Sequence, residues 1–169
     1  MALFKIVYWL GIIIELVIRA PYYKNQKAAK TDQRVFLTEQ VLLVLLTIGG
    51  LVLPLIYSLT RWLDFADYNL PLWVGWLGVA LMGCSLFIFA RAHADLKSNW
   101  SPSLEIYAGH SLIPQGIYGH IRHPMYACQF CFNPFYILRV KAEEKMMLDT
   151  FGDPYREYMR KTGRVIPKF

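Results

Sequence analysis

Three long apolar runs dominate the first half of the chain, at residues 3–18, 41–59 and 70–90. The second run contains no charged residue, and about 20 apolar residues are enough for a helix to cross the hydrocarbon core of a bilayer. The first run resembles a signal peptide, but no small-residue cleavage site follows it, which favours a retained helix. The pattern therefore predicts three full transmembrane helices.

The second half of the chain has a different pattern. A fourth apolar stretch, residues 125–138, is interrupted by Asn133-Pro134. As a helix it would reach about 21 Å, less than the roughly 30 Å hydrocarbon core, so we predict a short re-entrant or interfacial segment. Residues 141–162 are polar, with apolar residues at helical spacing, and Gly152-Asp153-Pro154 predicts a break into two helices. The predicted fold is an all-α integral membrane protein with a helical C-terminal tail.

The composition agrees with a membrane location. Hydrophobic residues make up 56% of the 169 positions and charged residues only 18%, against about a quarter charged in soluble domains. This disfavours a soluble enzyme and excludes a disordered chain. The net charge of +6 is compatible with nucleic acid or a membrane surface, and the apolar runs favour the membrane. Three cysteines are too few for a disulfide scaffold.

The distribution of charge predicts the topology. Basic residues gather in residues 19–35 and again in residues 91–169, whereas residues 60–71 carry one arginine and two aspartates. By the positive-inside rule, the first loop and the C-terminal half are cytoplasmic, and the second loop and the N-terminus are outside. We therefore expect one membrane domain over residues 1–169, with the helices in 1–90 and the chemistry in 91–169.

Candidate chemistry is concentrated in residues 109–126, which contain three of the four histidines. Polar groups beside a membrane segment are costly unless they have a use. One alternative is a solvated loop whose Arg122 and His123 contact lipid headgroups. A zinc site built from His120, His123, Cys128 and Cys131 is another alternative, but both cysteines lie in an apolar run, so we expect no metal.

Three sequence elements occur in order from about residue 95 to residue 169. The first is His110-Ser111-Leu112-Ile113, followed by Gly116-Ile117-Tyr118. The second is Arg122-His123-Pro124-Met125-Tyr126. The third runs from Arg139 to Glu144 and continues with Phe151-Gly152-Asp153-Pro154-Tyr155, Tyr158 and the ending Gly163-Arg164-Val165-Ile166-Pro167. Together they resemble the isoprenylcysteine carboxyl methyltransferase family and its phospholipid methyltransferase relatives.

This resemblance implies S-adenosylmethionine as the methyl donor and a carboxylate or amine at the membrane surface as the acceptor. An isoprenylcysteine-like or other amphiphilic acceptor, at the cytoplasmic face, is the favoured expectation. Carried over by position, the expected cofactor-binding residues are His110, Ser111, Leu112, Ile113, Tyr118, His123, Pro124, Met125, Tyr126 and Glu143. The same resemblance makes Arg139 the expected catalytic and substrate-binding residue.

These residue types suit the chemistry that the resemblance implies. A sulfonium cation can lie against the faces of Tyr118 or Tyr126, and Glu143 can balance its charge. A carboxylate acceptor is already nucleophilic, and the Arg139 guanidinium can orient it with two parallel hydrogen bonds. Arg139 and Glu143 are four residues apart and share one helix face, so an ordinary surface ion pair is the alternative.

Other functions stay open at this stage. A phospholipid N-methyltransferase would need its amine acceptor deprotonated, and a sterol-reductase type would use a nicotinamide cofactor. A non-catalytic membrane interaction protein is the third possibility, because relatives usually have a membrane-crossing hairpin between the positions of Tyr126 and Arg139, where this chain has twelve residues.

Glu15 lies in the first apolar run, four residues before Arg19. We interpret these two residues as an i,i+4 ion pair near the cytoplasmic end of the first helix.

Overall fold

Helices form most of the protein in the computed structural model, which describes residues 2–23, 30–33, 37–67, 69–101, 105–107, 109–129 and 136–168. The α-helices are α1 (Ala2–Tyr23), α2 (Leu37–Thr47), α3 (Leu53–Leu59), α4 (Leu72–Leu96), α5 (Pro124–Gln129), α6 (Tyr136–Phe151) and α7 (Asp153–Lys161). A π-helix, η1 (Ile48–Val52), joins α2 to α3, and the 3₁₀ turns are η2 (Asp64–Ala66), η3 (Lys97–Asn99) and η4 (Gly116–Gly119). The helical class predicted from the sequence is confirmed.

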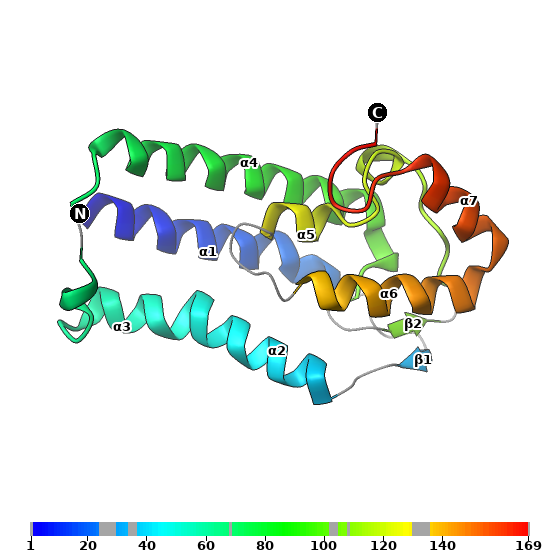
Figure 1. The fold of residues 1–169 in the computed structure, drawn as a ribbon, viewed down its shortest axis with the longest axis horizontal. Helices are drawn as coiled ribbons and strands as arrows, with labels where there is room; N and C mark the ends of the chain where they lie inside the picture. Colours follow the sequence, from blue (N-terminus) through cyan, green and yellow to red (C-terminus); the bar gives the residue numbers. More distant parts are fainter. Residues whose placement is uncertain are drawn as a thin grey trace.

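The three apolar runs correspond to α1, to α2–η1–α3 and to α4. Figure 1 shows these helices running along the long axis of the molecule in alternating directions. The predicted third helix ended at residue 90, but α4 continues to Leu96. An ion pair within α4, with Arg91 Nη2 3.4 Å from Asp95 Oδ1, accompanies this polar extension, and such i,i+4 pairs favour helix.

A π-helical turn interrupts the second apolar run at Gly49 and Gly50. A π turn shifts the backbone hydrogen-bond register and changes which carbonyls can accept other donors. Here the Tyr8 hydroxyl of α1 donates to Gly50 O at 2.5 Å. Two further bonds join α1 to α3, from Lys5 Nζ to Tyr57 O at 3.1 Å and from Trp9 Nε1 to Ser58 Oγ at 3.0 Å.

One helix among the described residues, spanning Leu72–Asn99, is long and apolar enough to cross a membrane. The continuous helix Leu43–Leu59 is apolar but shorter. Large apolar side chains are nevertheless exposed along all the long helices, for example Val17 at 65%, Val44 at 57% and Phe87 at 67%. Contiguous apolar surface of this kind is typical of contact with lipid. Three full crossings with a cytoplasmic C-terminal half remain a prediction.

The C-terminal half gathers at the end of the molecule where α1 and α4 finish (Figure 1). The predicted break of the polar tail is confirmed, because Gly152 separates α6 from α7 with a φ of 58°. The sequence did not predict that β1 (Lys30–Gln33) pairs antiparallel with β2 (Glu105–Tyr107) at this end. The core of this half contains Val140, Met146, Tyr155 and Tyr158, all buried.

The short helix α5 packs against α4, where the Ser85 hydroxyl donates to Cys128 O at 2.9 Å. The predicted re-entrant segment, residues 125–138, is described only in part. Its first residues belong to α5, α6 begins at Tyr136, and residues 130–135 lie outside the described residues. The re-entrant path therefore stays a prediction.

Candidate functional site

The site is built on an irregular segment that the end of α4 anchors. The Asp95 carboxylate accepts a hydrogen bond from Ile117 N at 2.8 Å, at the start of the η4 turn. Gly116 has a φ of 62°, and a Cβ there would clash with the same carboxylate. The turn holds Tyr118 in a buried position, where its carbonyl accepts a hydrogen bond of 2.6 Å from the Tyr158 hydroxyl of α7.

The turn at His123-Pro124 is held by the residues that follow α7, which we call the C-terminal segment (residues 162–168). Arg122 N donates to Gly163 O at 2.9 Å, and His123 N donates to Arg164 O at 3.0 Å. Pro124 then begins α5, where its missing N–H and fixed φ suit the first turn of a helix. These main-chain bonds fix the direction in which the His123 and Tyr126 side chains leave the turn.

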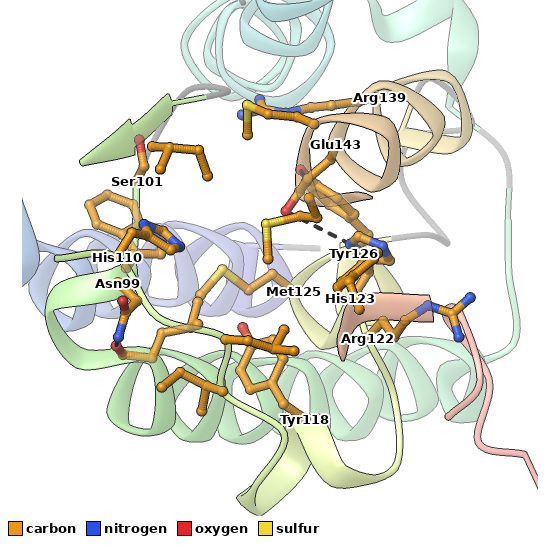
Figure 2. Close-up of a pocket in the computed structure, with 18 of the residues that line it drawn as sticks. Asn99, Ser101, His110, Tyr118, Arg122, His123, Met125, Tyr126, Arg139 and Glu143 are labelled. Atoms are coloured by element: carbon orange, nitrogen blue, oxygen red, sulfur yellow. Dashed lines mark hydrogen bonds and ion pairs between the residues drawn. The ribbon is translucent and has the colours of Figure 1, made fainter. Parts of the chain in front are cut away.

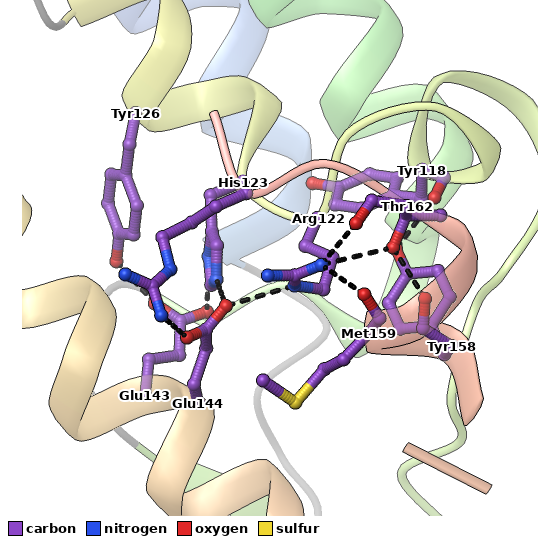
Figure 3. Close-up of polar contacts among 10 residues, drawn as sticks. Tyr118, Arg122, His123, Tyr126, Glu143, Glu144, Tyr158, Met159 and Thr162 are labelled. Carbon is purple, nitrogen blue, oxygen red and sulfur yellow. Dashed lines mark hydrogen bonds and ion pairs between the residues drawn. The ribbon is translucent and has the colours of Figure 1, made fainter. Parts of the chain in front are cut away.

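Two adjacent carboxylates of α6 meet this turn in different ways (Figure 3). Glu143 accepts a 2.5 Å hydrogen bond from the Tyr126 hydroxyl. Glu144 is buried and accepts bonds from Arg122 Nε at 2.9 Å and Arg164 Nη2 at 2.6 Å. His123 lies between the two carboxylates, with Nδ1 3.9 Å from Glu143 Oε1 and Nε2 3.5 Å from Glu144 Oε1.

The charge state of Glu144 follows from these contacts. Burial alone would raise its pKa, but the contacts with His123, Arg164 and Arg122 outweigh burial and lower the pKa to about 2. Arg122 also donates to two carbonyl oxygens, Met159 O of α7 at 3.0 Å and Thr162 O directly after α7. The ion pair between Arg122 and Glu144, which Arg164 also joins, therefore links the turn, α6 and the C-terminal segment.

A cavity of about 200 Å³ lies beside this ion pair. Figure 2 shows His110 on one side of it and Tyr126, His123 and Glu143 on the opposite side, with Tyr118 between them. Ten of the eleven residues expected from the sequence line it, namely His110, Ser111, Leu112, Ile113, Tyr118, His123, Met125, Tyr126, Arg139 and Glu143. Pro124 does not line the cavity; it is fully buried at the start of α5. The roles of these residues remain predictions.

The cavity has features that suit a polar, positively charged ligand with apolar parts. The His110 Nδ1 atom is buried and has no hydrogen-bond partner among the described residues. Burial lowers the pKa of His110, and the nearby Glu143 carboxylate only partly opposes this shift, so the neutral form of the ring is favoured. Glu143 supplies a carboxylate, and Leu112, Ile113 and Met125 supply apolar walls. A nucleoside-linked sulfonium such as S-adenosylmethionine fits this combination of an unused ring nitrogen, a carboxylate and apolar walls.

Several lining residues were not expected from the sequence. Asn99 positions the first motif, because its Oδ1 accepts a 2.8 Å hydrogen bond from Ser111 N. Arg19 and Leu43 reach the cavity from α1 and α2, helices that the sequence assigned only to the membrane. No local signal could have found them, because they lie far from the motifs in the sequence.

Across residues 2–23, 30–33, 37–67, 69–101, 105–107, 109–129 and 136–168, no three His, Cys, Asp or Glu side chains are grouped so that they could hold a metal ion.

Comparison with known families adds a finding. The model of the isoprenylcysteine carboxyl methyltransferase (ICMT) family matches residues 76–135, about a third of the chain. The match confirms the resemblance. It covers most of α4, the site segment and α5, and it supports a membrane methyltransferase kind of function. Helices α1 and α2, and the Arg139 and Glu143 positions on α6, lie outside it. No curated protein matches the chain.

Proposed function

We propose that the protein transfers a methyl group from S-adenosylmethionine to the carboxylate of an isoprenylcysteine-like or other amphiphilic acceptor at the cytoplasmic face of a membrane. The observation that carries the proposal is the single cavity into which the fold gathers the motif residues. Glu143 and Arg139, of opposite charge, line this cavity together with apolar side chains of the long helices, Leu43 and Phe89. A cationic donor and an acidic, lipid-like acceptor would both find complementary groups there.

The methyl donor would occupy the side of the cavity formed by residues 110–126. When bound, S-adenosylmethionine supplies a sulfonium methyl group, so that a C–O bond forms on the acceptor while the S–CH3 bond breaks and leaves a neutral thioether. The Tyr126 hydroxyl orients Glu143, whose carboxylate would balance the positive charge of the donor. Tyr118 and Tyr126 offer aromatic faces to a cation, and His110 Nδ1 offers an unused polar atom.

The acceptor would lie toward α6 and the long helices. A carboxylate needs no general base, because it is already the nucleophile, so the rate depends on alignment and on removal of water. Arg139 would hold the carboxylate in line with the methyl group through charge-assisted hydrogen bonds. An amine acceptor would instead need to lose a proton and would meet a positive charge at Arg139.

The first experiment measures binding of S-adenosylhomocysteine to the purified full chain by calorimetry. We expect measurable binding, and we expect His123→Ala and Tyr126→Ala to weaken it about tenfold or more. The control is Lys161→Ala, an exposed residue of α7, which should bind like the unmodified protein. Equal binding by all three variants would contradict the assigned roles, and no binding by the unmodified protein would contradict the methyltransferase proposal.

The second experiment identifies the acceptor class. Methylation of N-acetyl-S-farnesylcysteine is compared with methylation of phosphatidylethanolamine in vesicles. The proposal expects a carboxyl methyl ester on the first substrate. Methylation of the amine alone would favour the phospholipid N-methyltransferase alternative, and cofactor binding without turnover on either would favour a non-catalytic relative.

A further inference from the structure

Arg19 of α1 lines the same cavity as Glu143 and Tyr126, although it belongs to a helix outside the family match. Its neighbours along the cavity are apolar and come from α2 and α4, including Leu43 and Phe89. The Arg19 guanidinium carbon lies 5.1 Å from the centroid of the Phe89 ring and 5.9 Å from that of Trp100. Both rings are buried, so they restrict the plane in which the guanidinium can lie.

The hydrogen bonds of Arg19 leave one donor unused. Its Nη2 atom pairs with Glu15 Oε1 at 3.2 Å, as the sequence predicted. Its Nε atom is buried and has no hydrogen-bond partner among the described residues. An unsatisfied donor on a charged group is costly when it is buried, and this one belongs to a residue of the cavity wall. A ligand oxygen in the cavity would relieve that cost.

The charges around the cavity indicate which kind of ligand this is. Arg122 is neutralised by Glu144, and Glu143 is engaged by Tyr126 on the proposed donor side. Arg139 and Arg19, the second of which is paired with Glu15, are two further arginines that line the cavity. An acidic group next to an apolar chain would contact both a guanidinium and the apolar side chains there.

We propose that Arg19 is a second acceptor-binding residue, which selects amphiphiles that carry an acidic group next to their apolar chain. The Arg19 Nε–H donates to an anionic oxygen of the acceptor, and Phe89 and Trp100 hold the guanidinium in position. The inference deepens the proposed function and rests on it. It gives α1, beyond its place in the membrane, a direct part in choosing the substrate.

The test compares two ligands that differ only in charge. Binding of N-acetyl-S-farnesylcysteine and of its neutral carboxamide is measured in lipid nanodiscs with S-adenosylhomocysteine present. We expect the unmodified protein to bind the acid at least tenfold more tightly than the amide. Arg19→Gln should reduce this preference about tenfold and leave the dissociation constant of S-adenosylhomocysteine within about twofold. Arg19→Lys, which keeps the charge but loses the Nε–H donor, should give an intermediate preference.

Two further variants separate ligand binding from a structural role. Glu15→Gln removes the partner of Arg19, and Arg156→Gln removes an exposed arginine of α7 that is also paired with an acid, Asp153. Both should keep the preference for the acid. If Glu15→Gln lowers the preference as much as Arg19→Gln does, Arg19 acts only through its ion pair and the inference is wrong.

The remaining outcomes are equally decisive. An unchanged preference in Arg19→Gln, with S-adenosylhomocysteine still bound, overturns this inference alone. Failure of the unmodified protein to bind S-adenosylhomocysteine overturns the proposed function and this inference with it. If Arg19→Gln does not fold, Arg19→Lys decides, because a preference equal to that of the unmodified protein would contradict binding through the Nε–H donor.

Discussion

Glu143 and Glu144 are neighbours in the sequence, but the fold gives them different surroundings. Glu143 lines the cavity, and the Tyr126 hydroxyl is bonded to it. Glu144 is only 4% exposed and is shared between Arg122 and Arg164. The first carboxylate is thus available to a ligand, whereas the second holds the turn, α6 and the C-terminal segment together. Separate variants should therefore affect binding and stability separately.

Tyr126→Phe tests the binding role at single-atom resolution. The change removes the hydroxyl that bonds Glu143 and keeps the ring that stacks on His123 at a centroid distance of 5.5 Å. Without its donor, the Glu143 carboxylate is less well oriented, so we expect S-adenosylhomocysteine binding to weaken about five- to tenfold with little change in melting temperature. Tyr57→Phe, which removes an exposed hydroxyl bonded to Asp67, is the matched control and should bind normally.

Glu144→Gln tests the stabilising role. The change leaves two arginines without their buried anion, and breaking such a pair costs about 3–5 kcal/mol. For a chain of this size we expect the melting temperature to fall by about 6 °C or more. The control Glu157→Gln breaks an exposed pair with Lys161 and should melt within about 1 °C of the unmodified protein. Equal melting of both variants would show that the buried ion pair does not stabilise the fold.

The same residue predicts a pH dependence of stability. The pKa of Glu144 is about 2 in the folded protein and 4.5 without the fold. A lowered pKa stabilises the fold above the unfolded value, and the stabilisation is lost as the pH falls toward the folded value. The difference in stability between the unmodified protein and Glu144→Gln should therefore be constant from pH 7 to about 5 and should shrink between about pH 4.5 and 2. Urea titrations at several pH values measure it, and a constant difference down to pH 3 would contradict the assignment.

At the scale of elements, the sequence predicts features that depend on adjacent residues, but not contacts between distant segments. The break between α6 and α7 follows from Gly152 and Pro154, which are adjacent to it. The bond between Arg122 and Glu144 joins residues 22 positions apart, and the β1–β2 pairing joins segments much farther apart. Periodicity and turn propensity carry no information about such contacts. The motif resemblance supplied most residues of the site, but not Arg19 or Asn99.

Gly152→Ala tests the break itself. Gly152 has a φ of 58° and a ψ of −126°, a conformation that an L-residue adopts only at a cost of about 1–3 kcal/mol. We expect the melting temperature to fall by about 2–12 °C and cofactor binding to weaken, because α7 supplies Tyr155 and Tyr158 to the cavity wall. Gly83→Ala in α4, where no atom lies near the added methyl group, is the control and should not destabilise the protein.

At the scale of the whole molecule, the site lies at one end of the long helices. In Figure 1 the connection between α3 and α4 lies at the end opposite α6, α7 and the strands. The exposed aromatic residues of that connection, Trp62 at 78% and Phe65 at 84%, are of the kind that anchors a membrane protein at the lipid headgroups. The cavity and these aromatics would then lie at opposite faces of the bilayer, with the basic C-terminal half on the cytoplasmic side.

Labelling with a membrane-impermeant thiol reagent tests this arrangement directly. The variants are Asn69→Cys and Lys161→Cys, because both positions are exposed and lie at opposite ends of the long helices. Both are made in a chain whose native cysteines are replaced by serine, so that the reagent labels only the introduced cysteine. Three crossings place position 69 outside and position 161 inside, so intact cells should label only Asn69→Cys, and permeabilised cells should label both. Lys168→Cys is the internal control and should behave like Lys161→Cys. Labelling of positions 69 and 161 from the same side would mean that α4 does not cross the bilayer, and it would contradict the topology of three crossings.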